Sequence, residues 1–289
     1  MYPAVRVLTT VEYDACVGNG ASRRSIGSAN AEYDRFADIY AAWTDSATST
    51  GGNLRFYVDT YLAADCPVVE LGIGDGRIAV EAARRGCLVT GVDVSGAMLE
   101  RCRTRAERAG VTDRLTLVQA DFRDFNLAKP AALVALPYHS IGHLTTLDEK
   151  RAAVGHVFNQ LRPGGRFIFD DFFMTSALMA HMRQVQLRAA YQTPERADCL
   201  LWVTSLVDEA KQTISVVTWE DILGEHGRLE QRHYRRLSLS WLEPTQARDL
   251  LTGAGFSVET CFGDFNRTSF DPESAVEQIW IARKPDRGK

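Results

Sequence analysis

The residues best suited to chemistry form a short glycine-rich stretch, residues 70–77, in which Gly72, Gly74 and Gly76 follow Glu70. An apolar run precedes this stretch and a helical pattern follows it, so the spacing predicts a strand, a tight turn and a helix start. Glycine lets the backbone approach a ligand because no Cβ stands in the way, and free N–H groups at a helix start attract anions. A glycine-rich turn without a ligand would have the same sequence pattern. The residues around it are therefore needed to distinguish a binding loop from a plain turn.

Asp93 stands at the end of the next apolar run, residues 88–92, where an acidic side chain can accept hydrogen bonds from ribose hydroxyls. A capping or turn role is the alternative for this residue. The dinucleotide fingerprint needs its third glycine at position 77, but that position is Arg77 and the glycine is Gly76. The spacing therefore favours a nucleoside ligand and disfavours NAD or a nucleotide-sugar enzyme.

Two histidines, His139 and His143, follow a fourth apolar run, residues 131–136. Histidines at a strand end suit proton removal near neutral pH, although each could instead be a structural histidine bonded to nearby backbone. Asp170 and Asp171 end a fifth run, where adjacent side chains point to opposite faces, so only one can face a site. We take His139, His143 and Asp170 as catalytic candidates. The sequence offers no metal-ligand triad, and we expect no metal.

The elements that must position these residues alternate between strand and helix. Strand patterns cover residues 68–71, 88–92, 115–118, 131–136 and 166–169, and helical patterns cover residues 78–85, 96–109 and 147–161. This alternation predicts βαβ units and a parallel sheet. Later strand-like runs cover residues 200–207, 213–222 and 231–239, and a helix over 244–254 precedes closing strands over 256–262 and 276–282. The three later runs predict an inserted antiparallel sheet, and the last closing strand should be antiparallel.

The chain has 289 residues, a formal net charge of -4 and no long basic tract. Such a chain is a poor candidate for holding a phosphate backbone, so we expect no nucleic-acid partner. No apolar run has the length of a signal peptide or a transmembrane helix, and the six cysteines form no CxxC pair. We therefore expect a cytoplasmic protein without a membrane partner.

Four stretches, residues 68–76, 90–95, 119–122 and 161–165, resemble in order and spacing the motifs of class I S-adenosylmethionine (SAM) dependent methyltransferases. The loop after the fourth strand is similar to the S-I-G-H-L run of aminosugar N-methyltransferases and to the N-S-F-A-H-L run of glycine N-methyltransferase. His143 matches the histidine of both runs, and His139 stands where the second has asparagine. The resemblance implies an α/β fold: a seven-stranded, doubly wound, Rossmann-like sheet with a helical cover and the inserted antiparallel sheet.

The resemblance also implies SAM as the cofactor and a role for each matching residue. Its methionine part and ribose would be lined by Glu70, Gly72, Gly74 and Gly76, with Asp93 on the ribose hydroxyls. The adenine would lie against Val94 and Met98, with Asp121 and Phe122 at its amino group. Leu136 would lie near the sulfonium, and Tyr40 and Tyr57 would reach over the carboxylate or, alternatively, only pack in the core.

The expected organisation is a flexible arm (1–30), a helical cover (31–66), a SAM-binding core (67–173), an inserted sheet that encloses the acceptor (174–243) and C-terminal core strands (244–289). Aromatic residues near the insert, among them Phe172, Trp219 and Tyr234, would line the acceptor pocket or form the core of the inserted sheet.

We expect methyl transfer to nitrogen or oxygen of a small natural-product or sugar-like acceptor by direct displacement. C-methylation and SAM binding without catalysis remain alternatives, and a homo-oligomer is left open.

Overall fold

The computed structural model describes residue 39 and residues 50–65, 68–192 and 197–286. Tyr40, the expected arm over residues 1–30 and most of the expected cover over residues 31–66 therefore lie outside the described residues.

A seven-stranded sheet forms the centre of the molecule, with the strand order β10-β11-β5-β4-β1-β2-β3. Its strands are β1 (Val68–Leu71), β2 (Val89–Asp93), β3 (Leu115–Gln119), β4 (Ala131–Leu136), β5 (Leu161–Phe172), β10 (Ser257–Phe262) and β11 (Glu277–Arg283). The five strands β1 to β5 are parallel, and β11 runs antiparallel to both of its neighbours. The predicted fold class is confirmed.

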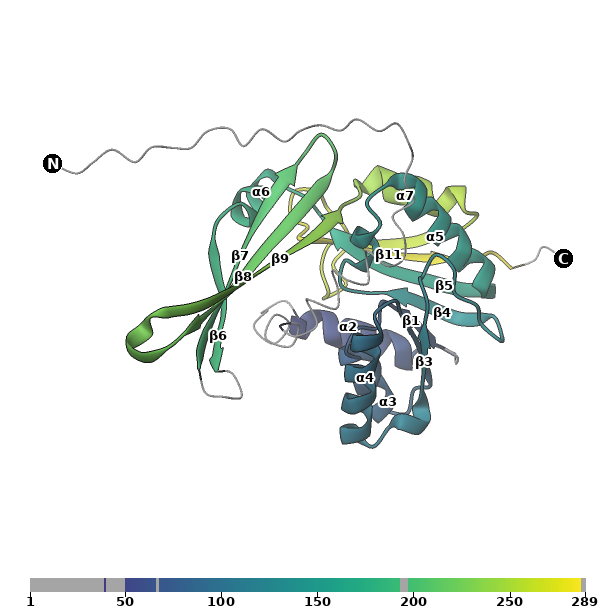
Figure 1. Ribbon diagram of the computed structural model, residues 1–289. Coiled ribbons are helices and arrows are strands. Elements are labelled where there is room, and N and C mark those ends of the chain that lie inside the picture. Colours follow the sequence, from purple (N-terminus) through teal and green to yellow (C-terminus); the bar gives the residue numbers. More distant parts are fainter. Residues whose placement is uncertain (1–38, 40–49, 66–67, 193–196, 287–289) are drawn as a thin grey trace, which may run out of the picture.

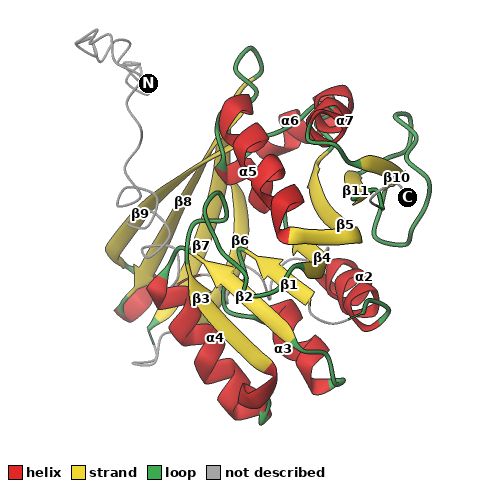
Figure 2. Ribbon diagram, turned by 90° about the vertical axis from the view of Figure 1, so that its right-hand side faces the viewer, coloured by secondary structure: helices red, strands yellow, loops and turns green. Residues whose placement is uncertain are grey.

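Helices cover both faces of this sheet, as Figures 1 and 2 show. One face carries α2 (Thr50–Leu62), α3 (Arg77–Arg84) and α4 (Gly96–Ala109), and the other carries α5 (Leu147–Gln160) and α7 (Pro244–Gly253). Neighbouring residues of β1 enter different cores: Val68 joins the α2–α4 side, and Val69 joins the α5–α7 side. Burial on both faces explains why the central strands are continuous apolar runs in the sequence.

A separate antiparallel sheet leaves the core after β5 and returns to it at α7 (Figure 1). The chain first forms α6 (Ser176–Met182), then β6 (Gln186–Gln192), β7 (Asp198–Asp208), β8 (Thr213–Leu223) and β9 (Leu229–Ser240), which pair in that order. The prediction of three strands was incomplete, because β6 is a fourth. This edge strand begins and ends with glutamine, and its register shifts between Leu187 and Ala189, so its alternation of apolar and polar residues is interrupted.

Within the described residues, some of the short connections contain a 3₁₀ helix: η1 (Thr112–Arg114), η2 (Ser140–His143) and η3 (Glu225–Gly227). None of the helices in the described part of the chain has the length and apolar character needed to span a bilayer.

The central strand β4 should dominate stability. Leu133, 2% exposed within β4, is packed between the sheet and the helices of the α2–α4 side. Replacing it in Leu133→Ala should lower the free energy of unfolding by about 2–5 kcal/mol, because the lost contacts leave a cavity. Leu206→Ala is the matched control: this β7 leucine is 61% exposed, and its loss should cost less than about 0.5 kcal/mol. Urea unfolding of both variants measures the difference, and equal losses would contradict the assigned core.

Candidate active site

The glycine loop after β1 is held in backbone conformations that glycine adopts without strain. Gly72, Gly74 and Gly76 have φ values of 63°, 56° and 78°. A Cβ at Gly76 would collide with the side chain of Cys102 on α4, so the loop packs tightly against that helix. The loop is also tied to β2 by the Ile73 N–H, which donates to the Val92 carbonyl at 3.1 Å. These contacts fix the loop at the carboxyl end of the parallel strands.

Asp93 ends β2 beside this loop and is only 6% exposed. Its two carboxylate oxygens accept hydrogen bonds from the backbone N–H groups of Gly74, at 2.8 Å, and of Ser95, at 2.9 Å. Ser95 in turn caps α4, because its hydroxyl accepts the N–H of Met98 at 3.1 Å. Asp93 is therefore held in a fixed position between the glycine loop and the start of a helix. Of the residues that follow, Val94 is half-buried and Met98 fully buried.

Glu70, near the end of strand β1 and just before the glycine loop, is almost completely buried. Burial raises the pKa of its carboxyl to about 8, although the nearby Tyr61 hydroxyl and the Arg77 charge oppose this rise. Glu70 is therefore mostly neutral at pH 7. Burial, and after it Glu70, likewise raise the pKa of Tyr61 above its ordinary value.

Asp121 lies beyond the end of β3, half-buried, and is engaged by Arg123. The Arg123 guanidinium donates from Nε to both Asp121 oxygens, at 2.9 and 3.0 Å, and also reaches Glu149 at 2.9 Å. The adjacent Phe122 packs on the α5–α7 core. Leu136, at the end of β4, is buried in the same core. The structure thus places these residues at the carboxyl edge of the sheet, and their contacts with a ligand stay predictions.

The histidine loop, residues 137–144, begins with an unusual backbone. Tyr138 and His139 have φ values of 61° and 55°, a left-handed conformation that is strained for residues other than glycine. Asp170, fully buried at the end of β5, accepts the N–H of Tyr138 and of His139, each at 2.9 Å. It also accepts the hydroxyl of Tyr57 from α2. Asp170 thus accepts three hydrogen bonds, and two of them hold the backbone of the histidine loop.

The ring of His139 is enclosed by acids and aromatic rings. Its Nε2 lies 2.8 Å from Glu277 Oε2 on β11 and 3.7 Å from Asp170 Oδ2, and the ring stacks on Phe172 at 3.8 Å between centroids. Burial lowers the pKa of His139, but the charges of Glu277, Asp170 and Asp171 prevail and raise it to about 9. His139 is therefore an imidazolium at pH 7, which can donate but not accept a proton.

His143, the last residue of η2, differs from His139 in its protonation state. Burial lowers the pKa of this imidazole to about 4, and the charge of Lys150 acts in the same direction. The Lys150 ammonium is itself buried in α5 and donates to the Ile141 carbonyl at 2.6 Å. His143 is thus neutral at pH 7, and it is the histidine of this loop that can accept a proton.

The two adjacent carboxylates at the end of β5 point to opposite faces, as strand geometry requires. Asp170 faces the α2 side through Tyr57, whereas Asp171 accepts the N–H of Leu242 at 2.9 Å, at the junction between β9 and α7. Burial raises the pKa of Asp171 to about 6, against the opposing charges of Lys150 and His139.

Comparison with known proteins identifies the part of the chain that carries the glycine loop. Residues 68–165 match the model of a family described as methyltransferase domain. The structure of the CcbJ methyltransferase from Streptomyces caelestis superposes with a TM-score of 0.72 over 89% of this chain and 99% of that one, at 22% identity. Residues 68–165 thus resemble a methyltransferase domain, and the chain as a whole shares the fold of CcbJ.

Two further proteins resemble this chain over a shorter stretch or with a lower TM-score. A carboxy-S-adenosyl-L-methionine synthase from Aliivibrio salmonicida is 31% identical over 131 residues, 42% of this chain and 53% of that protein. The chain therefore spans about half the length of this curated relative. The glycopeptide N-methyltransferase MtfA, solved with S-adenosyl-L-homocysteine, is 26% identical, with a TM-score of 0.51 over 81% of this chain and 89% of that one.

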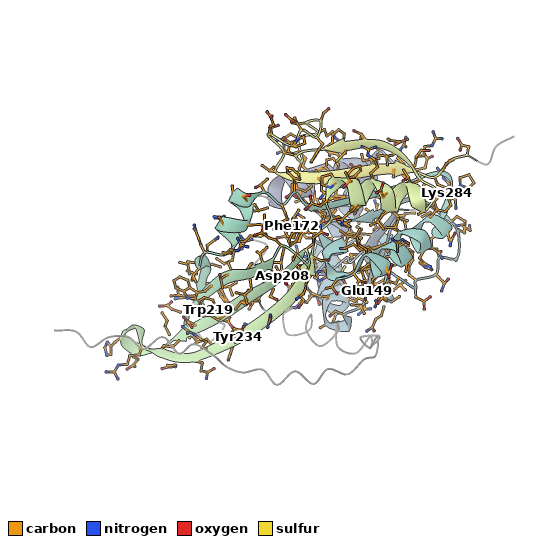
Figure 3. All side chains as sticks on the ribbon, turned by 90° about the horizontal axis from the view of Figure 1, so that it is seen from above. Glu149, Phe172, Asp208, Trp219, Tyr234 and Lys284 are labelled. Carbon is orange, nitrogen blue, oxygen red and sulfur yellow. The ribbon has the colours of Figure 1, made fainter. Side chains whose placement is uncertain are left out.

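The structure brings Tyr57, His139 and Asp170 into one hydrogen-bonded group. Sequence reasoning missed its fourth member, Glu277, which lies far along the chain on a strand that no local motif marks. Single ligand atoms of His139, Asp170 and Glu277 lie within 4.8 Å of one another. Of the aromatic residues predicted for the pocket, Figure 3 places Phe172 near the meeting point of the two sheets and Trp219 and Tyr234 out on the four-stranded sheet.

The charge of His139 should depend on Glu277. Glu277→Gln removes the negative charge at 2.8 Å, so the pKa of His139 should fall from about 9 toward or below its ordinary value of 6.5. NMR titration of the His139 ring protons measures this shift. Glu259→Gln, which breaks a pair with Arg166 on β10 and β5, should leave the His139 pKa unchanged. The assignment fails if both variants titrate like the wild type.

The same pair should make stability depend on pH. Because the folded-state pKa of His139 is raised above 6.5, its contribution is complete below pH 6.5 and is lost as pH rises through about 9. The difference in the free energy of unfolding between wild type and Glu277→Gln should therefore shrink between these pH values. Urea unfolding at pH 6, 7.5 and 9.5 measures it, and a constant difference would argue against a charged His139.

Proposed function

We propose that this protein is a SAM-dependent methyltransferase that methylates nitrogen or oxygen of a small-molecule acceptor. One observation carries the proposal: the glycine loop and the histidine loop lie in contact at the carboxyl edge of the sheet. A Cβ built on Gly72 would lie 3.1 Å from the Ser140 hydroxyl of the histidine loop. A cofactor on the first loop would therefore lie beside an acceptor on the second.

The residues at the loop fit SAM. The Asp93 carboxylate is positioned at the loop for ribose hydroxyls, and the glycines leave the backbone open to the ribose and the methionine part. Among the described residues, one buried oxygen of Glu70 finds no hydrogen-bond partner, as expected for a group that meets a ligand. Val94 and Met98 would contact the adenine, Asp121 and Phe122 its amino group, and Leu136 the region of the sulfur. Because Tyr57 donates to Asp170, we assign it to support of the histidine loop in place of the carboxylate contact.

SAM supplies a methyl group on a positively charged sulfur that needs no acid to leave, so the protein mainly has to position the acceptor and exclude water. We assign proton acceptance from the acceptor to His143, the neutral histidine. The imidazolium of His139, which shares one of its protons with Glu277, can only donate a hydrogen bond toward an acceptor oxygen or nitrogen. Asp170 holds His139 in place through the backbone at the start of the histidine loop.

A small acceptor agrees with the rest of the molecule. The net charge of -4 disfavours a nucleic-acid substrate. MtfA, at 26% identity, is named as a glycopeptide N-methyltransferase, which supports a natural-product acceptor and nitrogen as the methylated atom.

Cofactor binding is tested first. Calorimetry should detect binding of SAM and of S-adenosylhomocysteine but not of NADH. Asp93→Ala should weaken the binding of S-adenosylhomocysteine by about 1.5–3 kcal/mol, the usual worth of hydrogen bonds to a charged group. Circular dichroism checks that the variant is folded, since Asp93 also holds Gly74 and Ser95. Unchanged affinity in a folded variant, or binding of NADH alone, would refute the assignment.

The roles of the histidines are tested by rate and pH. His143→Gln should lower kcat about 10²–10⁴-fold, the usual worth of a general base, with little change in SAM affinity. In the wild type kcat should fall as pH drops through about 4, where His143 becomes protonated, and as pH rises through about 9, where His139 loses its proton. His139→Gln should remove the high-pH limb alone. Wild-type kcat in both variants, measured by methyl transfer from labelled SAM to a panel of aminosugars and phenols, would exclude both histidines.

A further inference from the structure

A cavity of about 610 Å³ lies at the amino ends of the parallel strands, at the opposite edge of the sheet from the glycine loop. It is lined by the end of α2, the starts of β4 and β5, part of β10 and the end of β11. Arg166 in its wall and Asp170 at the histidine loop are four residues apart on β5, about 13 Å along the strand. Figure 3 places Lys284, just past the end of β11, at the end of the core that points away from the four-stranded sheet. The cavity is therefore separate from the candidate active site.

The inner wall of this cavity is apolar, and charged side chains surround it. Leu133 of β4 and Ile168 of β5 are almost fully buried, and Ile281 of β11 pairs with Ile168 in the sheet. Seven charged residues also line the cavity, four arginines and three acids: Arg162, Arg166, Arg267 and Arg283, with Asp65, Glu259 and Asp286. A lining of this kind suits a small molecule that has both an apolar part and a charged part.

The arginines outnumber the acids of the cavity. Three ion pairs have N–O distances of 2.7 to 2.8 Å: Arg162 with Asp65, Arg166 with Glu259, and Arg283 with Asp286. Arg267 forms no ion pair with an acid among the described residues, since it donates to the Thr60 hydroxyl at 3.1 Å and lies over the Phe56 ring. Four arginines against three carboxylates leave the lining with a formal net charge of +1. The cavity therefore favours an anion.

The guanidinium groups also have more N–H donors than the surrounding protein uses. Arg283 donates to Asp286 from Nη2 at 2.8 Å, while its buried Nε has no hydrogen-bond partner among the described residues. Each guanidinium has five N–H donors, so the ion pair satisfies Arg283 only in part. The arginines of the three ion pairs are about half exposed, and pairs of this kind contribute little to stability. A ligand with several negatively charged oxygens could therefore bind these groups at little cost to the fold.

We propose that this cavity binds a small organic phosphate. The unpaired Arg267 and the partly satisfied Arg283 hold the phosphate, and the apolar wall takes the organic part. At pH 7 a phosphate ester carries nearly two negative charges and three acceptor oxygens, which match several guanidinium groups better than a carboxylate does. A volume of about 610 Å³ is within the usual range for a small-molecule site. Because the cavity lies at the other edge of the sheet, this binding does not depend on the proposed function.

Phenyl phosphate is a suitable probe, because it joins an apolar ring to a phosphate. Calorimetry should give a Kd below about 1 mM for phenyl phosphate, and phenol and inorganic phosphate should each bind at least about tenfold more weakly. Benzoate, which carries a carboxylate on the same ring, should also bind more weakly. Saturating S-adenosylhomocysteine should leave the Kd of phenyl phosphate unchanged, because the two sites lie at opposite edges of the sheet.

Three variants locate the bound probe. Arg267→Met and Arg283→Met should each weaken the binding of phenyl phosphate about tenfold, as expected for lost hydrogen bonds to a charged group. Arg183→Met is the matched control: this arginine has a similar exposure and forms an ion pair with Glu209 away from the cavity, so its loss should leave the Kd unchanged. Circular dichroism checks that each variant is folded, and either cavity variant is sufficient for the test.

Selective weakening of phenyl phosphate in Arg267→Met or Arg283→Met supports the phosphate site. The site is overturned if the wild type does not bind phenyl phosphate, if both cavity variants bind it like the wild type, or if Arg183→Met loses as much affinity. Equal affinity for benzoate would overturn the assignment of a phosphate, and displacement by S-adenosylhomocysteine would assign the probe to the cofactor site. If S-adenosylhomocysteine itself does not bind, the proposed function fails, while the variants still decide whether the cavity binds phosphate.

Discussion

One buried carboxylate, Asp170, sets the geometry on which the site depends. Left-handed backbone at two successive residues other than glycine is unfavourable, and Asp170 offsets it by accepting the N–H groups of both Tyr138 and His139. The same carboxylate binds Tyr57, so the loop, the end of β5 and α2 are held at one point. Its neighbour Asp171 faces the other side of the sheet. There it accepts the N–H of Leu242, at the point where the chain passes from the four-stranded sheet to α7. Two consecutive residues thereby connect the core, the loop and the inserted sheet.

The histidine loop also shows that neighbouring charges can give two histidines different protonation states. His139 and His143 are four positions apart, yet their pKa values are about 9 and about 4. Both are buried enough to favour the neutral form, and the difference comes from the nearest charge: a glutamate on β11 for the first and a lysine on α5 for the second. One short loop can therefore contain a proton acceptor and a proton donor at the same pH.

Local patterns in the sequence predicted the fold well because β1 and β4 are buried on both faces and helices such as α3, α4 and α7 each bury an apolar stripe. The glycine loop and Asp93 could be singled out because their residue types and spacing form a pattern in the sequence, although the contacts that hold the loop come from the next strand and helix. The edge strand β6 was missed because a register shift interrupts its alternation. The partnership of His139 with Glu277, and of Asn53 with Arg77, arises only when distant strands and helices meet. The spacing of residues in the sequence cannot predict these contacts. It also cannot predict the charge states that result from them.

The insertion of a whole sheet between β5 and α7 also constrains the order in which the chain can fold. β6 to β9 pair with their neighbours along the chain, so this meander can form from local contacts. β5 must wait for β11, its partner from Arg166 to Phe172, until the insert and α7 have been synthesised. Until then the apolar edge of β5 is open, and edges of this kind recruit strands from other chains. We expect the nascent chain to be most prone to aggregation in that interval, when the insert is complete and the core sheet is not.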